Sequence, residues 1–164
     1  MIDISREEVI KYLSFTDMLK LKASERENIL LEIIDDFDDS DLSNHFYNDQ
    51  LVEYLRISYK GIKNIYLRRK MEQFIPGLKI NIIGKEEELN PCFCCGYKTI
   101  EFRGEYEICP VCFWEDDGVK LGTAYSNVNH MTLDDAKVNY IKIGAVSDKM
   151  KPYVIHDPDV KFNK

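Results

Sequence analysis

The stretch PCFCCGYKTIEFRGEYEICPVCFW, residues 91–114, holds all five cysteines of this 164-residue chain. Four of them form two C-x-x-C pairs, Cys92 with Cys95 and Cys109 with Cys112. Thirteen residues separate the two pairs. One C-x-x-C turn brings two sulfur atoms near a metal ion, and two such turns close a tetrahedral cage. The spacing therefore predicts a zinc-ribbon-like metal site in which these four cysteines are the ligands.

The residues around the cysteines suit turns of this kind. Gly96 directly follows the first pair, where glycine tolerates a positive φ and leaves backbone N–H groups free to face the thiolates. Pro110 lies inside the second pair and stiffens it. Zinc is the expected cofactor, because four thiolates without a redox role suit it. Iron in a rubredoxin-like site uses a similar cage, and the spacing alone leaves that metal open.

The segment between the pairs has the pattern of a β-hairpin. Residues 97–102 alternate in side-chain character, Arg103-Gly104 is a turn dipeptide, and residues 106–108 form the returning strand. We therefore expect the hairpin to join the two cysteine turns. Directly after the second pair, Glu115, Asp116 and Asp117 predict a capped turn that ends at Gly118. A second metal site and a contact for a basic partner are the alternatives for these three carboxylates.

Cys94 lies directly beside Cys95 and is the fifth thiol of the cluster. A buried thiol that points away from the metal, or a weak donor near it, is one interpretation. The other is a reactive thiol, since a nearby metal cation lowers a thiol pKa. His130 is the best histidine candidate for nucleophilic catalysis, but nothing in the sequence pairs it with Cys94. We assign no catalytic and no cofactor-binding residue.

The first 77 residues have helical patterns. Ser5 with Glu8 and Ser24 with Glu27 match the S-x-x-E capping box, and each precedes apolar residues at helical spacing. A further helical pattern covers residues 48–74 and is interrupted near Gly61. Between these segments, residues 35–41 carry five aspartates, which predicts an acidic loop. The loop lacks the glycine and the final glutamate of an EF-hand, so we do not expect it to bind calcium.

The remainder of the chain mixes short strands with one helix. Residues 78–83 predict a strand or a connector, and a charged linker leads from there to the cysteines. Thr132 starts a helix that ends at Gly144, and the last 15 residues or so have an irregular pattern. The expected fold class is α+β, with a helical N-terminal region (residues 1–77) and a metal-binding domain (residues 78–164) that contains the β-hairpin and the C-terminal helix.

The formal net charge of −7 indicates which classes of partner the chain can bind. Nucleic-acid binding needs a basic surface, and the cluster at residues 68–70 is small, so neither DNA nor RNA is expected as a partner. Acidic proteins suit basic protein partners. No stretch reaches the length of a membrane span, and residues 1–13 lack the pattern of a secretory leader. A cytoplasmic location is expected, and clustered cysteines in a reducing compartment favour metal binding over disulfides.

Three segments together resemble the bacterial cysteine-rich CPCC family: CFCCGYKTI (92–100), EYEICPVCFWEDDG (105–118) and NHMTLDDAKVNYIKIGAV (129–146). The resemblance covers roughly residues 90–153. It departs from the family at Phe93, where the name-giving proline would stand, and in the looser segment GTAYSNVN before the helix. The resemblance implies a small metal-binding domain in a small bacterial protein. It implies no activity, and some members sit among toxin–immunity systems.

Two classes of function fit these observations. The first is a protein-binding module built on a structural zinc ribbon, in its sharpest form an immunity protein that blocks a basic toxin. The alternative is a redox-active or metal-dependent enzyme that uses Cys94 or an open metal position. Four cysteine ligands would close the coordination sphere, and closed zinc sites are structural. We therefore favour the protein-binding module over an enzyme.

Overall fold

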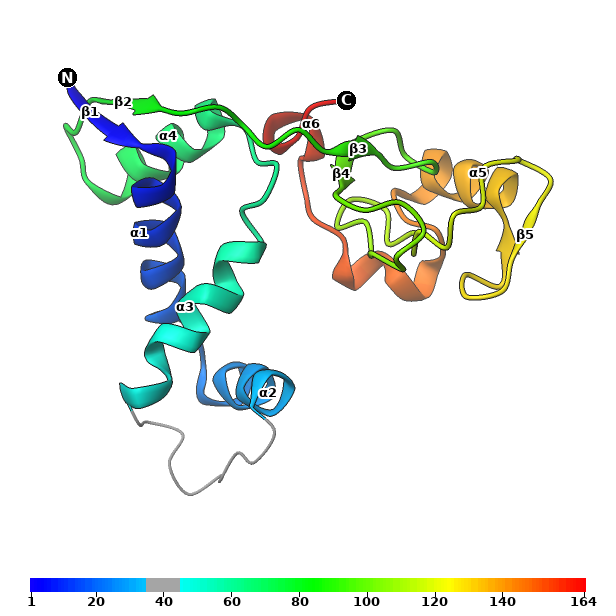
Figure 1. Cartoon of the computed structure of the whole chain (residues 1–164), viewed down its shortest axis with the longest axis horizontal. Coiled ribbons are helices and arrows are strands. Elements are labelled where there is room, and N and C mark those ends of the chain that lie inside the picture. Colours follow the sequence, from blue (N-terminus) through cyan, green and yellow to red (C-terminus); the bar gives the residue numbers. More distant parts are fainter. Residues whose placement is uncertain (35–44) are drawn as a thin grey trace. The chain divides into compact units, whose positions relative to one another are not determined.

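The computed structural model describes residues 1–34 and 45–164 and has the expected α+β class (Figure 1). The acidic run at residues 35–41 lies outside the described residues. The contacts divide the chain into two compact units. The N-terminal unit comprises residues 1–60 and 64–85, and the C-terminal unit comprises residues 61–63 and 86–164. The domain boundary expected between residues 77 and 78 stays a prediction.

Within its described residues, the N-terminal unit contains four helices and one strand pair. The helices are α1 (Arg6–Met18), α2 (Ala23–Ile33), α3 (Asn48–Ile57) and α4 (Asn64–Phe74), with a short 3-10 helix, η2 (His45–Tyr47), before α3. Helix α1 packs against α3 and α4 (Figure 1). Buried Met18, Leu30, Leu51 and Val52 form a core among α1, α2 and α3. The helical pattern of the N-terminal region is therefore confirmed for the described residues.

The two expected helix starts differ in outcome. At α1, the Ser5 hydroxyl accepts a hydrogen bond from the Glu8 N–H at 3.2 Å, and the Glu8 carboxylate accepts from the Ser5 N–H at 2.9 Å, so this capping box is confirmed. The start expected at Ser24 is wrong. Helix α2 begins at Ala23, and the Glu25 carboxylate accepts the N–H of Lys22 at 2.8 Å. Glu25 therefore accepts the capping-box hydrogen bond that we expected Glu27 to accept. Glu25 lies two residues before Glu27 in the chain.

The N-terminal unit also contains a parallel strand pair. The strand expected within residues 78–83 is present as β2 (Ile80–Ile83), and its neighbour is β1 (Ile2–Ser5). Isoleucines at positions 2 and 4 face isoleucines at positions 80 and 82 across the pair. Strand β1 was not expected from the sequence, because four residues are too few to show a period and the partner strand is distant along the chain.

A polar cluster links α1 with α4. The Tyr59 hydroxyl donates to the Asp17 carboxylate, and the Lys70 ammonium donates to the same carboxylate at 2.9 Å. Burial and the Asp17 carboxylate raise the pKa of Tyr59, so the phenol stays protonated as a donor. Lys70 belongs to the basic cluster at residues 68–70, and this ion pair uses one of its three charges within the unit.

The C-terminal unit consists of short strands, one long helix and two short helices: β3 (Asn90–Pro91), β4 (Lys98–Ile100), β5 (Tyr125–Ser126), β6 (Met131–Thr132), α5 (Leu133–Ile143), η3 (Asp148–Tyr153) and α6 (Pro158–Lys161). The expected bounds of α5 are confirmed. The Thr132 hydroxyl accepts the Asp135 N–H at 3.2 Å, and Gly144 ends the helix with a φ of 76°.

The tail after α5 is less irregular than expected. It forms η3 and α6, and Pro158 is the first residue of α6, where its fixed φ favours a helix start. Across residues 1–34 and 45–164, no helix has the length and apolar character that crossing a membrane requires.

Candidate metal centre

The four expected ligands lie in two turns with the same backbone. We call residues 92–97 the first knuckle and residues 109–114 the second knuckle. In each, the N–H of the first cysteine donates to the carbonyl five residues further along. These bonds join Cys92 to Tyr97 at 2.8 Å and Cys109 to Trp114 at 2.9 Å. Each knuckle therefore directs both of its cysteines toward the same side of a closed turn.

The residue that follows the second cysteine completes each knuckle. Its N–H donates back to the first cysteine's carbonyl, from Gly96 to Cys92 at 2.9 Å and from Phe113 to Cys109 at 2.8 Å. This bond requires a left-handed backbone at that position, with φ of 82° at Gly96 and 67° at Phe113. The positive φ expected at Gly96 is confirmed, but its N–H donates to the Cys92 carbonyl and is not free to face a thiolate. The second knuckle places a bulky residue in the same left-handed conformation.

The strand pairing differs from the hairpin expected between the cysteine pairs. Strands β3 and β4 pair across the first knuckle, with Asn90 opposite Ile100, and Ile108 pairs with Glu115 across the second. The Glu107 carboxylate accepts the backbone N–H groups of Glu101 at 2.7 Å and Phe102 at 2.8 Å. The expected pairing across Arg103-Gly104 is wrong, because each strand pairs across its own knuckle and a carboxylate closes the loop between them.

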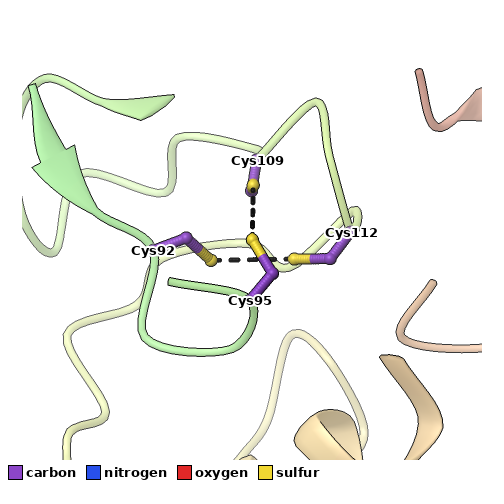
Figure 2. A group of neighbouring side chains, drawn as sticks. All are labelled: Cys92, Cys95, Cys109 and Cys112. Atoms are coloured by element: carbon purple, nitrogen blue, oxygen red, sulfur yellow. Dashed lines mark hydrogen bonds between the residues drawn. The ribbon is translucent and has the colours of Figure 1, made fainter. Parts of the chain in front are cut away.

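The two knuckles bring four thiols together. The Sγ atoms of Cys92 and Cys112 lie 3.6 Å apart, as do those of Cys95 and Cys109, and Figure 2 shows the two pairs pointing toward one another. All four ligand atoms lie within 4.8 Å of one another, and all four residues are buried. Four sulfur donors that converge in this way are positioned to bind a metal ion that prefers soft ligands.

The protons of the thiols are unevenly distributed. Hydrogen bonding to Cys109 raises the pKa of Cys95, and burial raises the pKa of Cys112. Burial acts in the same direction on Cys109, but hydrogen bonds from the other thiols and from Thr99 outweigh it and hold its pKa well below the usual value. The Thr99 hydroxyl lies 3.1 Å from the Cys109 Sγ. Cys109 is therefore the thiolate that the cluster stabilises before a cation arrives.

Cys94 lies outside the group of four. It occupies the third position of the first knuckle, which Val111 occupies in the second knuckle. Both side chains are buried, with 7% of Cys94 and 1% of Val111 exposed. Cys94 thus takes the place of an apolar residue, and solvent has little access to it. This agrees with the interpretation of Cys94 as a buried thiol rather than a reactive one.

Arg103, which was expected only as part of a turn, connects the two knuckles. Arg103 donates to the Asp116 carboxylate at 2.7 Å and to the Pro91 carbonyl. Its guanidinium also lies 3.8 Å from the ring centroid of Phe93, inside the first knuckle. Only 1% of Asp116 is exposed. Arg103 therefore joins the chain just before the first knuckle to the chain just after the second. In the sequence, the only sign of this role was the position of Arg103 midway between the two C-x-x-C pairs.

The acidic residues after the second knuckle form the expected capped turn. Asp116 accepts the Gly118 N–H at 3.0 Å, and Asp117 accepts the Val119 N–H at 3.3 Å. Asp116 is buried and cannot serve a partner's surface. His130, the histidine considered for catalysis, is exposed in the turn between β5 and β6.

These features define a metal-binding domain with two knuckles and four cysteines. Residues 90–160 match the model of the family described as Cysteine-rich CPCC. The match supports a domain of the cysteine-rich CPCC family in this part of the chain. Comparison with curated proteins and with solved structures returned no significant match.

Proposed function

We propose that the four-cysteine site holds a structural zinc ion. The observation that carries this proposal is the closed set of four buried thiols within 4.8 Å of one another. A closed set of four protein ligands leaves no position for water or substrate, and zinc sites of this kind stabilise folds. Metal binding and folding of the knuckles are then coupled, because a short loop-rich segment has little other means of holding its shape.

Elemental analysis of the purified chain tests the metal. The expected result is about one zinc per chain, without the visible absorption of an iron–thiolate site. A colourless protein that folds fully without metal contradicts a structural role. If the analysis finds one equivalent of iron, the proposal changes from zinc to iron, and the four cysteines remain the proposed ligands.

We further propose that the C-terminal unit is a protein-binding module. We call residues 101–108 the knuckle loop, because they connect the two knuckles. Three large side chains of this loop are exposed, with 58% of Phe102, 58% of Tyr106 and 49% of Ile108 accessible. Exposed aromatic residues gathered in one loop are typical of protein interfaces. Glu105, also exposed, adds an acidic group to the same loop.

The acidic character of the chain suggests the kind of partner. The net charge of −7 would speed association with a basic protein and repel nucleic acid. An immunity protein that covers a basic toxin in the cytoplasm is the sharpest form of this proposal. The knuckle loop would provide the apolar centre of the contact, and the surrounding carboxylates its charge.

Purification from the host, followed by an assay against a toxin encoded next to the gene, tests the partner. The double variant Phe102→Ser, Tyr106→Ser should lose at least about tenfold in affinity while it retains its metal. Tyr125→Ser is the matched control, since Tyr125 is 56% exposed but lies in β5 outside the knuckle loop. Absence of any bound basic protein, together with no effect on the neighbouring toxin, would count against the proposal.

A further inference from the structure

A cavity of about 430 Å³ lies in the C-terminal unit, beside the second knuckle. Its apolar lining comes from Val111 of that knuckle, Ile143 at the end of α5, and Val154, Ile155 and Pro158 of the tail. The volume falls in the range of about 300–1,000 Å³ typical of small-molecule sites. These side chains leave room for a short branched aliphatic group.

A hydrogen bond and a tight turn shape the backbone beside the cavity. The Ile155 N–H donates to the carbonyl of Pro110, inside the second knuckle, at 3.0 Å. Two residues later, Asp157 adopts a left-handed conformation with a φ of 55° and a ψ of 52°. Residues other than glycine take this conformation rarely, and aspartate and asparagine tolerate it best. Asp157 thereby turns the chain at the edge of the cavity.

Groups of both charges line the same cavity. Asp157 provides a carboxylate, and the end of α5 at Gly144 provides carbonyl groups with a partial negative charge. Lys151 provides an ammonium group, which also pairs with Asp148 at 2.9 Å, and His156 provides an imidazole. A ligand with one positive and one negative group would therefore meet complementary charges within one small space.

We propose that this cavity binds a small α-amino acid with a branched aliphatic side chain. The ammonium group of the ligand lies toward Asp157 and the end of α5, and its carboxylate lies toward Lys151 and His156. The side chain contacts the partly exposed apolar residues Ile143, Val154 and Ile155, behind which Val111 is buried. The second knuckle forms one wall, so the site depends on the folded metal centre but not on which metal fills it.

The test uses methyl NMR spectra of the full chain, purified with its metal, and three probes. L-leucine should shift the methyl resonances of Ile143, Val154 and Ile155 in a saturable manner. L-leucinamide lacks the carboxylate and 4-methylpentanoate lacks the ammonium group, so each should bind about three- to tenfold more weakly.

Two variants assign the charged groups. Asp157→Asn keeps a residue that tolerates the left-handed backbone, and it should weaken L-leucine about three- to tenfold without weakening 4-methylpentanoate. Lys151→Gln should weaken L-leucine without weakening L-leucinamide. Lys149→Gln is the control, because Lys149 is exposed on η3 and does not line the cavity.

The proposal is overturned if L-leucine causes no saturable shift at millimolar concentrations. It is equally overturned if 4-methylpentanoate or L-leucinamide binds as tightly as L-leucine, or if the control variant weakens binding as much as Lys151→Gln does.

Discussion

The first and second knuckles hold their cysteines with the same backbone turn but support it with different side chains. At the left-handed position, the first knuckle has Gly96 and the second has Phe113. The first uses glycine's freedom, whereas the second retains a strained residue whose ring lies 5.6 Å from that of Tyr153. The arrangement of the cysteines therefore depends on the backbone turn and not on one residue type at the left-handed position. Where that residue is not glycine, side-chain packing can offset the free-energy cost of the left-handed backbone.

The third position of each knuckle also shows that different side chains can support the same turn. Cys94 in the first knuckle and Val111 in the second fill equivalent apolar places. The extra thiol of the C-C pair is thus a small buried residue by position, although its chemistry resembles that of the ligands beside it.

The largest effect is expected from removing a ligand rather than its neighbour. Cys109→Ala should lose the metal and unfold most of the C-terminal unit, because ligation and folding are coupled. Cys94→Ala should retain the metal and lose at most about 1–2 kcal/mol of unfolding free energy through the missing sulfur. Metal content and the near-ultraviolet circular dichroism of buried Trp114 measure both effects. Metal loss in Cys94→Ala, together with metal retention in Cys95→Ala, would reverse the assignment of the first knuckle.

The next largest effect should come from separating the knuckles at Arg103. Arg103→Met leaves the buried Asp116 carboxylate without its cation, at a cost of about 3–5 kcal/mol in unfolding free energy. Chemical denaturation of the metal-bound chain measures the loss, and Lys120→Met, at an exposed lysine, is the control. Adding Asp116→Leu should restore part of the stability, because the unpaired charge is then gone. An unchanged midpoint in Arg103→Met would show that the knuckles need no link besides the metal.

The pH dependence of metal binding should involve both knuckles. The raised pKa values of Cys95 and Cys112 mean that both thiols carry protons at neutral pH until the ion displaces them. Displacement of these two protons makes the affinity rise by at least about a hundredfold per pH unit and fall equally as the pH decreases. Cys109 contributes less to this pH dependence, because its lowered pKa favours the thiolate before the ion binds. Competition with a chelator of known pH dependence measures the slope, and a pH-independent affinity contradicts this distribution of protons.

The smallest effects compare the left-handed positions directly. Gly96→Ala should lose about 1–2 kcal/mol of unfolding free energy from backbone strain alone, because the added Cβ would lie 3.6 Å from its nearest neighbour, an ordinary contact. In the second knuckle, Phe113→Gly should be more stable than Phe113→Ala by a similar amount. Thermal unfolding of the four proteins, wild type included, tests whether the strain is equal. A preference for alanine at position 113 would show that the two turns are not equivalent.

Local patterns predicted the features that depend on neighbouring residues. The capping box at Ser5, the bounds of α5 and the turn of each knuckle all rest on contacts within a few positions of the chain, where residue type dictates geometry. The start of α2 was displaced even so, because Glu25 and Glu27 both stood at a spacing suited to a return bond. Short-range patterns identify a helix more reliably than its first residue.

Features that depend on distant residues could not be predicted in the same way. Strand β1 exists because it pairs with β2, in which Ile80, the partner of Ile2, lies 78 positions further along the chain. The hairpin was expected across Arg103-Gly104, but the strands pair across each knuckle instead. In the second knuckle, Ile108 pairs with Glu115. Alternation indicates a strand but does not name its partner.

The sequence alone determined that four cysteines in two short turns would act together, because each turn is a local structure whose shape follows from a few residues. Tertiary structure decided that Arg103 would hold Asp116 and Phe93 between those turns, and that the tail would form a cavity against the second knuckle. Both arrangements exist only after remote segments are packed together, since burial and electrostatic pairing depend on distance in space rather than along the chain.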